Sequence, residues 1–207
     1  MLLIGNWSDP KPCNVPDEVQ VLQQVIESKN CTCHFCGTVT RLTSQTPLGF
    51  FDVCLGDRSL PDEPKNWVVL CKVCSDLNSL SKLKGKGSFI EAPWIKQGEL
   101  TNLLRLSYAI AVRPDNDWGV LKSASEAFLN AIDSAPEGWA GINWDGSVEG
   151  LEAARTRLVH PFTQSAYANQ LRFRYNLEPY EEAIRYWAVN LEQLVNEESN
   201  VESENAA

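Results

Sequence analysis

The chain has 207 residues, of which 43% are hydrophobic, and this is enough to build one sizeable core. Its formal net charge is −9, whereas the electrostatic term that dominates nucleic-acid affinity needs a surplus of positive charge. The composition therefore predicts a globular protein and argues against one whose main task is to bind DNA or RNA.

The N-terminal segment, residues 1–30, opens with "MLLIGNWSDPKP", an apolar stretch too short for a signal peptide and without a preceding positive region. No run of eighteen apolar residues follows anywhere in the chain. We therefore expect a cytoplasmic protein with no inserted membrane segment, in which residues 1–30 pack on the core. In such a compartment seven cysteines favour metal binding over disulfides.

Two cysteine knuckles stand out, "CTCHFCG" at residues 31–37 and "CKVC" at residues 71–74. Two Cys-x2-Cys pairs suit tetrahedral zinc, because a tight turn aims both sulfurs of a pair at one ion. Gly37 fits the left-handed backbone that such a turn often needs. Cys31 competes with Cys33 for the first position, but a single intervening residue gives a poorer bite. We predict one structural Zn²⁺ held by Cys33, Cys36, Cys71 and Cys74.

The segments between the knuckles predict a strand in "LGFFDVCLGD", residues 48–57, and a Pro-rich loop over 58–65. A second apolar run, "NWVVLCKVCSDLNSL" over 66–80, delivers the second knuckle onto a helix. This order resembles the ββα-metal unit of HNH endonucleases, with Asn66 in the place of the family's central Asn. The resemblance implies an α+β fold class, with a treble-clef-like zinc unit followed by a mainly helical C-terminal part.

The residues that an HNH nuclease uses for catalysis are not matched. Such an enzyme needs a His as general base and further ligands for a divalent ion. Of the two histidines, His34 lies inside the first knuckle and His160 lies in "LVHPF", far from the unit. Cys54 occupies the neighbourhood of the family's basic His, and Ser-Asp at 75–76 follows the second knuckle. We therefore predict no catalytic residues and no enzyme activity.

Residues 85–112, "GKGSFIEAPWIKQGELTNLLRLSYAIAV", predict a Gly-rich turn, a short strand with a Pro-Trp pair, and an apolar helix from near Gln97. Together with "CTCHFCG" and "NWVVLCKVC", this segment resembles the IcmJ/DotN family of Dot/Icm-type IVB secretion machines over residues 31–112, and more faintly over 171–191. The resemblance implies a non-catalytic subunit of the coupling complex at the inner-membrane face. In that complex the family's proteins bind the C-terminal segment of the coupling ATPase alongside small acidic adaptor proteins.

The rest of the chain predicts three helices. The first carries an apolar stripe over residues 118–132 that we expect to be core, the second starts after Ser147, and the last starts at Pro179. The last helix is expected to bury one face, made of Ala183, Ile184, Trp187, Leu191 and Leu194. The predicted organisation is an N-terminal segment 1–30, a zinc-binding domain 31–112, a helical region 113–195 and a disordered acidic tail 196–207.

Two alternatives remain open. An HNH-class nuclease would cleave DNA with a divalent ion and needs a basic groove. A nucleic-acid-binding zinc protein needs basic residues around the knuckles, where residues 31–74 hold four Lys and Arg against four Asp and Glu. Residues 116–207 are acidic, with fifteen Asp and Glu against six Lys and Arg. The basic run "KLKGKG" at 82–87 is interpreted as a solvated loop.

Overall fold

The computed structural model describes residues 18–57, 60–112, 119–137, 144–150 and 170–189, and the side chain of Leu80 is left out. Helices alternate with two small antiparallel sheets, so the fold mixes α and β structure. Its elements are α1 (Val19–Ser28), β1 (Phe51–Leu55), β2 (Trp67–Cys71), α2 (Lys72–Asp76), β3 (Gly87–Glu91), α3 (Gln97–Ala111), α4 (Gly119–Asp133), β4 (Leu171–Tyr175) and a helix over 181–189. Short 3-10 turns lie at Pro64–Asn66, Leu80–Leu83 and Glu178–Tyr180. The predictions for the acidic tail and for His160 fall outside the described residues.

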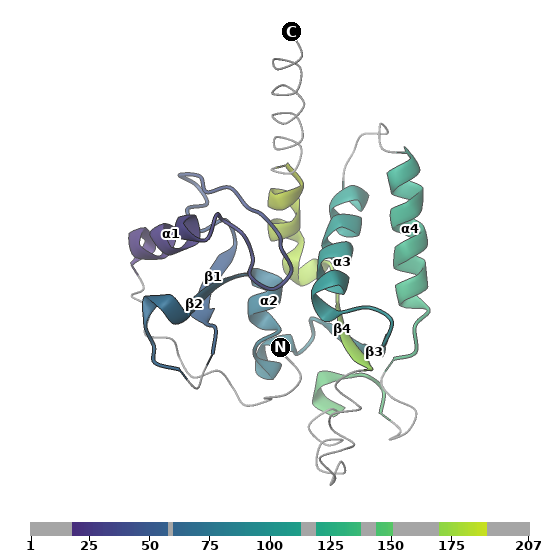
Figure 1. Ribbon diagram of the computed structural model, residues 1–207. Coiled ribbons are helices and arrows are strands. Elements are labelled where there is room, and N and C mark those ends of the chain that lie inside the picture. The colour runs from purple at the N-terminus through teal and green to yellow at the C-terminus, as the bar shows by residue number, and fades with distance from the viewer. Residues whose placement is uncertain (1–17, 58–59, 113–118, 138–143, 151–169, 190–207) are drawn as a thin grey trace.

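The first sheet pairs β1 with β2, in a register that sets Phe51 opposite Cys71 and Leu55 opposite Trp67. Both strands are rich in branched and aromatic residues, which suit a pleated, half-buried surface. Helix α2 follows β2 without a loop and packs against both strands, while α1 lies beside β1 (Figure 1). The predicted order of strand, loop, strand and helix is confirmed.

The second sheet pairs β3 with β4, setting Gly87 opposite Tyr175. The sequence analysis did not predict β4, although Leu-Arg-Phe-Arg-Tyr alternates strictly and buries its first, third and fifth side chains. This sheet joins residues on both sides of position 112, so the predicted zinc-binding domain and the predicted helical region share structure. The Pro93–Trp94 pair follows β3 and does not lie in it.

Helix α3 begins at Gln97, as predicted, and forms an antiparallel hairpin with α4. The expectation that the α4 stripe is core is largely wrong. Of the stripe residues, Leu121 is 47% exposed and Ala124, Ala127 and Ala131 are also exposed, and the described part of α4 buries only Ser125 and Ile132. The reason is that α3 covers one side of α4, and no other helix or strand in the described ranges packs extensively against it.

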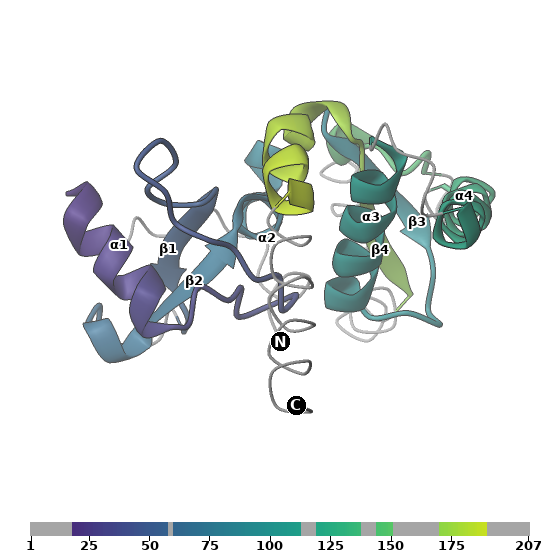
Figure 2. The ribbon, with the colours of Figure 1, turned by 90° about the horizontal axis from the view of Figure 1, so that it is seen from above.

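The helix over 181–189 lies between the β1–β2–α2 unit and the α3–α4 hairpin in both views (Figures 1 and 2). Trp187 is 1% exposed, packs edge to face against Phe51 at 6.3 Å between ring centroids, and donates its indole N–H to the Gly49 carbonyl at 3.1 Å. Ala183 and Ile184 are buried as predicted. The helix over 181–189 therefore completes the core of the β1–β2–α2 unit.

Candidate metal centre

The first knuckle forms directly after α1. Asn30 and Cys31 take positive φ angles of 54° and 48°, which turn the chain back on itself. The Cys33 N–H then donates to the Thr38 carbonyl at 2.8 Å, and the Gly37 N–H donates to the Cys33 carbonyl at 3.0 Å. Gly37 has φ +74°, so the predicted left-handed position is confirmed. These bonds set the two cysteines of the knuckle on one side of a rigid turn.

The second knuckle straddles the junction of β2 and α2. Cys71 ends the strand and Cys74 lies in the first turn of the helix, so the change from strand to helix brings their side chains together. The His34 N–H donates to the Val69 carbonyl at 2.8 Å, which attaches the first knuckle to the outer edge of β2. This backbone bond positions the two knuckles face to face.

The four predicted ligands meet in one buried cluster, in which all four sulfur atoms lie within 4.8 Å of one another. The sulfurs of Cys36 and Cys71 are 3.7 Å apart, close to the edge of about 3.8 Å that follows from Zn–S bonds of about 2.3 Å in a tetrahedron. That distance is far beyond a disulfide bond of about 2.05 Å. The cluster could therefore hold a metal ion.

The electrostatics of the cluster also favour a cation. Burial, reinforced by the neighbouring thiols, raises the pKa of Cys74 well above the usual thiol value, and burial also raises the pKa of Cys71. Hydrogen bonds from the other three thiols lower the pKa of Cys33. Without a cation the four groups therefore compete for protons, whereas a divalent ion allows all four to ionise. The Thr38 hydroxyl lies 3.1 Å from the Cys36 sulfur and can donate to the thiolate.

The two other described cysteines lie outside this cluster. Cys31 is half-buried. Its burial raises the pKa of its thiol, and the nearby Glu27 charge raises this pKa further. Cys54 is half-buried on β1, with its sulfur 4.0 Å from the Ser75 hydroxyl oxygen. Neither residue adds a fifth sulfur to the four.

Asn66 holds together the loop between β1 and β2 through hydrogen bonds of its side-chain amide. Its amide oxygen accepts the Asp57 N–H at 2.9 Å, and its amide nitrogen donates to the carbonyls of Asp57 and Pro61 at 2.7 and 3.1 Å. These bonds close the loop at the base of the β1–β2 pair. His34, the one histidine in the described ranges, has an exposed side chain on the first knuckle.

Sequence reasoning missed a buried carboxylate next to the second knuckle. Asp76 is 1% exposed, pairs with the Lys86 ammonium, and accepts the Tyr180 hydroxyl at 3.1 Å. Lys86 belongs to the run expected to be a solvated loop, and this expectation is wrong for that residue. No motif marks the cluster, because Asp76 and Tyr180 are 104 positions apart. It joins α2 to the start of β3 and to the C-terminal helix.

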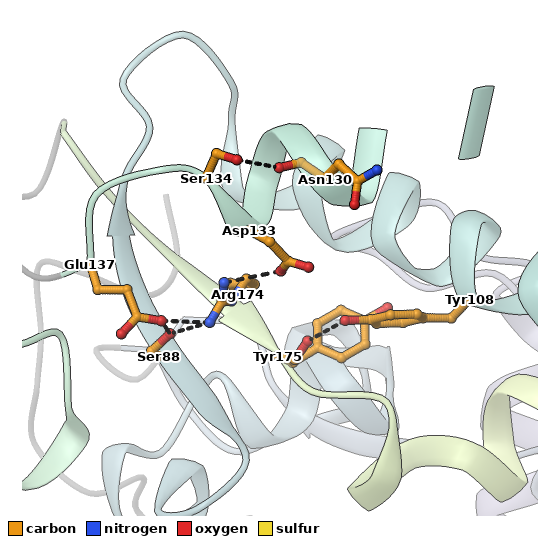
Figure 3. Close-up of polar contacts among 8 residues, drawn as sticks. All are labelled: Ser88, Tyr108, Asn130, Asp133, Ser134, Glu137, Arg174 and Tyr175. Carbon is orange, nitrogen blue, oxygen red and sulfur yellow. Dashed lines mark hydrogen bonds and ion pairs between the residues drawn. The ribbon is translucent and has the colours of Figure 1, made fainter. Parts of the chain in front are cut away.

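A second polar cluster surrounds Arg174 on β4, which is 15% exposed at its side chain (Figure 3). Its guanidinium pairs with Asp133 at 3.1 Å and with Glu137 at 2.6 Å. Beside it, the Tyr108 hydroxyl donates to the Tyr175 carbonyl at 3.1 Å, and burial together with the Asp133 charge raises the pKa of Tyr108 to about 12. Because Asp133 ends α4 and Arg174 lies on β4, this cluster fastens α4 to the second sheet.

Comparison with known proteins gave no match, either to models of protein families or to curated sequences. Within the described residues, no helix combines the length and apolar character that crossing a bilayer requires.

Proposed function

We propose that this protein is a non-catalytic subunit of a type IVB secretion coupling complex, related to the IcmJ/DotN family, with a structural zinc ion. Its HNH-like scaffold would bind the C-terminal segment of the coupling ATPase, next to small acidic adaptor proteins, at the cytoplasmic face of the inner membrane. The observation that carries the proposal is the buried four-sulfur cluster attached to β1, β2 and α2, in which all four clustered ligands are cysteines and the neighbouring His34 has an exposed side chain.

Zinc is the metal that the donor set supports best. Four clustered thiolates are soft ligands, and such a set favours tetrahedral zinc or iron over magnesium and calcium. Four protein ligands also fill every position of a tetrahedral ion, so none remains for water or substrate. The four cysteines are nine-tenths or more buried, which further separates them from solvent. These features support a structural ion and not a catalytic one.

The region beside α2 also supports a protein without nuclease activity. Cys54 faces the Ser75 hydroxyl at 4.0 Å, and neither group is a strong base near neutral pH. Asp52 lies 3.8 Å from the Lys72 ammonium, which lowers its availability for a divalent ion. The exposed His34 belongs to the knuckle and not to the strand on which an HNH enzyme carries its base.

The second candidate is an HNH-class nuclease, which the β1–β2–α2 arrangement itself favours. Zinc-loaded protein incubated with plasmid DNA and Mg²⁺ or Mn²⁺ separates the two functions. We expect one tightly bound zinc per chain and intact plasmid. Nicking that is abolished by Cys54→Ala, and retained in the matched variant Cys31→Ala, would establish the nuclease and reject the adaptor.

The partner is tested by capture from the native host. Tagged full-length protein is expected to retain a coupling ATPase, and a second capture in the presence of excess C-terminal segment of that ATPase is expected to lose it. An eluate without the ATPase, from protein that still contains its zinc, would reject the proposed partner.

A further inference from the structure

The proposed metal centre carries a charge that the protein has to offset. Four thiolates around one divalent ion leave roughly two net negative charges. The four cysteines are nine-tenths or more buried, and a buried charge is costly unless an opposite charge lies near it. A cation outside the set of ligands would therefore stabilise the loaded cluster.

The two lysines beside α2 already face carboxylates. The Lys86 ammonium pairs with Asp76, which is 1% exposed. The Nζ of Lys72 lies 3.8 Å from a carboxylate oxygen of Asp52 and 3.7 Å from one of Asp76. Because two ammonium groups face two carboxylates, this group of side chains contributes little net charge to the metal centre.

Arg105 on α3 is a buried cation whose hydrogen bonds leave its charge in place. The residue is 7% exposed, and its Nε and Nη2 donate to the Asn102 side-chain oxygen at 3.3 and 2.9 Å. The Asn102 amide is neutral, so these bonds satisfy donors without cancelling the charge. A guanidinium stays protonated when buried, and the protein interior screens its field less than water does. Arg105 can therefore act on charges that it does not touch.

Helix α3 lies against the first knuckle on the side that carries Arg105. A Cβ added to Gly98 would lie 2.8 Å from the carbonyl oxygen of Phe35, inside the Cys-x2-Cys turn. Arg105 follows Gly98 by seven residues, which is about two helical turns, and so shares its side of the helix. The guanidinium is bonded to Asn102 and therefore leans back over the preceding turn, toward the knuckle.

Tyr175 on β4 gives a second, independent link between Arg105 and the sulfur cluster. Its buried hydroxyl donates to the Thr101 carbonyl at 3.3 Å, one turn before Arg105. Burial raises the pKa of Tyr175 well above its usual value. The thiols of Cys71 and Cys36 raise this pKa further and the Arg105 guanidinium opposes them. Both knuckles and the guanidinium are therefore within electrostatic range of one hydroxyl.

We propose that Arg105 is the buried counter-charge of the metal centre, which stabilises the loaded four-thiolate cluster through its electric field without contacting the ion. The inference rests on the structural metal ion of the proposed function, and it names the group of this chain that helps four thiolates to stay ionised in the interior. Removal of this one charge should weaken the cluster more than an equal change of charge on the surface.

Iron in place of zinc converts the local charge into a measurable reduction potential. Four thiolates also bind iron, and reduction of Fe³⁺ to Fe²⁺ adds one negative charge to the cluster. A nearby cation favours the reduced form and so raises the potential. The measurement uses the full-length, iron-loaded protein. Because both oxidation states are compared in the folded protein, the potential separates an effect of charge from a change in folding stability.

Arg105→Gln is expected to lower the ratio of reduced to oxidised iron about tenfold, the order that Coulomb's law gives for a unit charge on the order of 10 Å away in a protein interior. This ratio corresponds to a decrease in potential of about 59 mV. Arg105→Lys keeps the charge and is expected to keep most of the wild-type potential. Equal shifts in both variants would mean that Arg105 acts through packing, and this result would overturn the proposal, as would an unchanged potential in Arg105→Gln.

An isosteric pair of variants decides the question even if Arg105→Gln does not fold. Asn102→Asp keeps the acceptor of the guanidinium but cancels its charge. We expect this variant to be at least as stable as the wild type in urea and yet to lower the potential as Arg105→Gln does. Asn130→Asp adds the same charge to the exposed surface of α4, where water screens it, and is expected to leave the potential unchanged. Equal potentials in the two Asp variants would overturn the proposal.

Zinc affinity, measured by competition with a chelator, gives a second readout. Asn102→Asp is expected to bind zinc about tenfold more weakly than Asn130→Asp, and equal affinities would overturn the proposal. Wild-type protein that binds neither zinc nor iron would reject the metal centre and the inference with it. Host capture without the coupling ATPase rejects the proposed partner alone, because both metal measurements use purified protein.

Discussion

The contact between α3 and the first knuckle makes Gly98→Ala a discriminating substitution. Two effects oppose each other. Alanine is more favourable than glycine in a helix by up to about 1 kcal/mol. The new Cβ would, however, lie 2.8 Å from the Phe35 carbonyl oxygen, closer than Cβ atoms approach other heavy atoms. Overpacking of this kind costs about 1–3 kcal/mol.

The clash should win, because the atom it meets is backbone. Phe35 lies between two predicted metal ligands, and the surrounding hydrogen bonds prevent the turn from moving away. We expect Gly98→Ala to lower the free energy of unfolding by up to about 2 kcal/mol, which is the cost of the clash less the full gain in helix propensity. Urea unfolding of the zinc-loaded protein measures it, and the Co²⁺ absorption spectrum reports whether the metal geometry is disturbed.

Gly119→Ala is the matched control, since nothing lies within 4 Å of the Cβ it would add on α4. It should leave stability unchanged or raise it by a few tenths of a kcal/mol. If Gly98→Ala proved as stable as this control, the close packing of α3 on the first knuckle would be refuted.

Three other perturbations test the remaining arguments. Cys36→Ser should lose the zinc and unfold the β1–β2–α2 unit, because much of the binding free energy of a structural metal site is folding free energy. Cys31→Ser is the control and should keep one zinc and a native fold. Metal analysis and circular dichroism spectra measure both variants. Asp76→Asn should lower the free energy of unfolding by about 2–4 kcal/mol, since it leaves the Lys86 ammonium without its anion, and urea unfolding measures this. Gln97→Ala should cost about 2–4 kcal/mol in the same assay, because the Phe173 N–H and carbonyl, bonded to Gln97 at 2.7 and 3.0 Å, would be buried without partners.

Each of these predictions can be contradicted directly. A native, metal-free Cys36→Ser protein would remove the structural role of the ion. A neutral Asp76→Asn substitution would mean that the buried ion pair contributes little, and a neutral Gln97→Ala substitution would mean that water reaches the edge of β4.

The sequence by itself determined the parts of this protein that short spacing controls. The two-residue spacing between cysteines determines how each pair can bind one ion. Gly37 permits the left-handed turn after Cys36, and the branched and aromatic residues favour the strands β1 and β2. Helix α3 likewise begins at Gln97 as its pattern predicts. In each case the residues that form the feature are close neighbours along the chain, so local conformational preference is enough to specify it.

The tertiary structure decided what depends on distant partners. β4 has a clear alternating pattern, but only its pairing with β3 makes it a strand of a sheet. The α4 stripe has the period of a core helix, yet burial depends on whether another element covers it, and α3 covers only one side. Arg105 and Asp76 look like ordinary charged residues in the sequence. Whether a buried charge meets an opposite charge is a matter of spatial proximity, which no local period encodes.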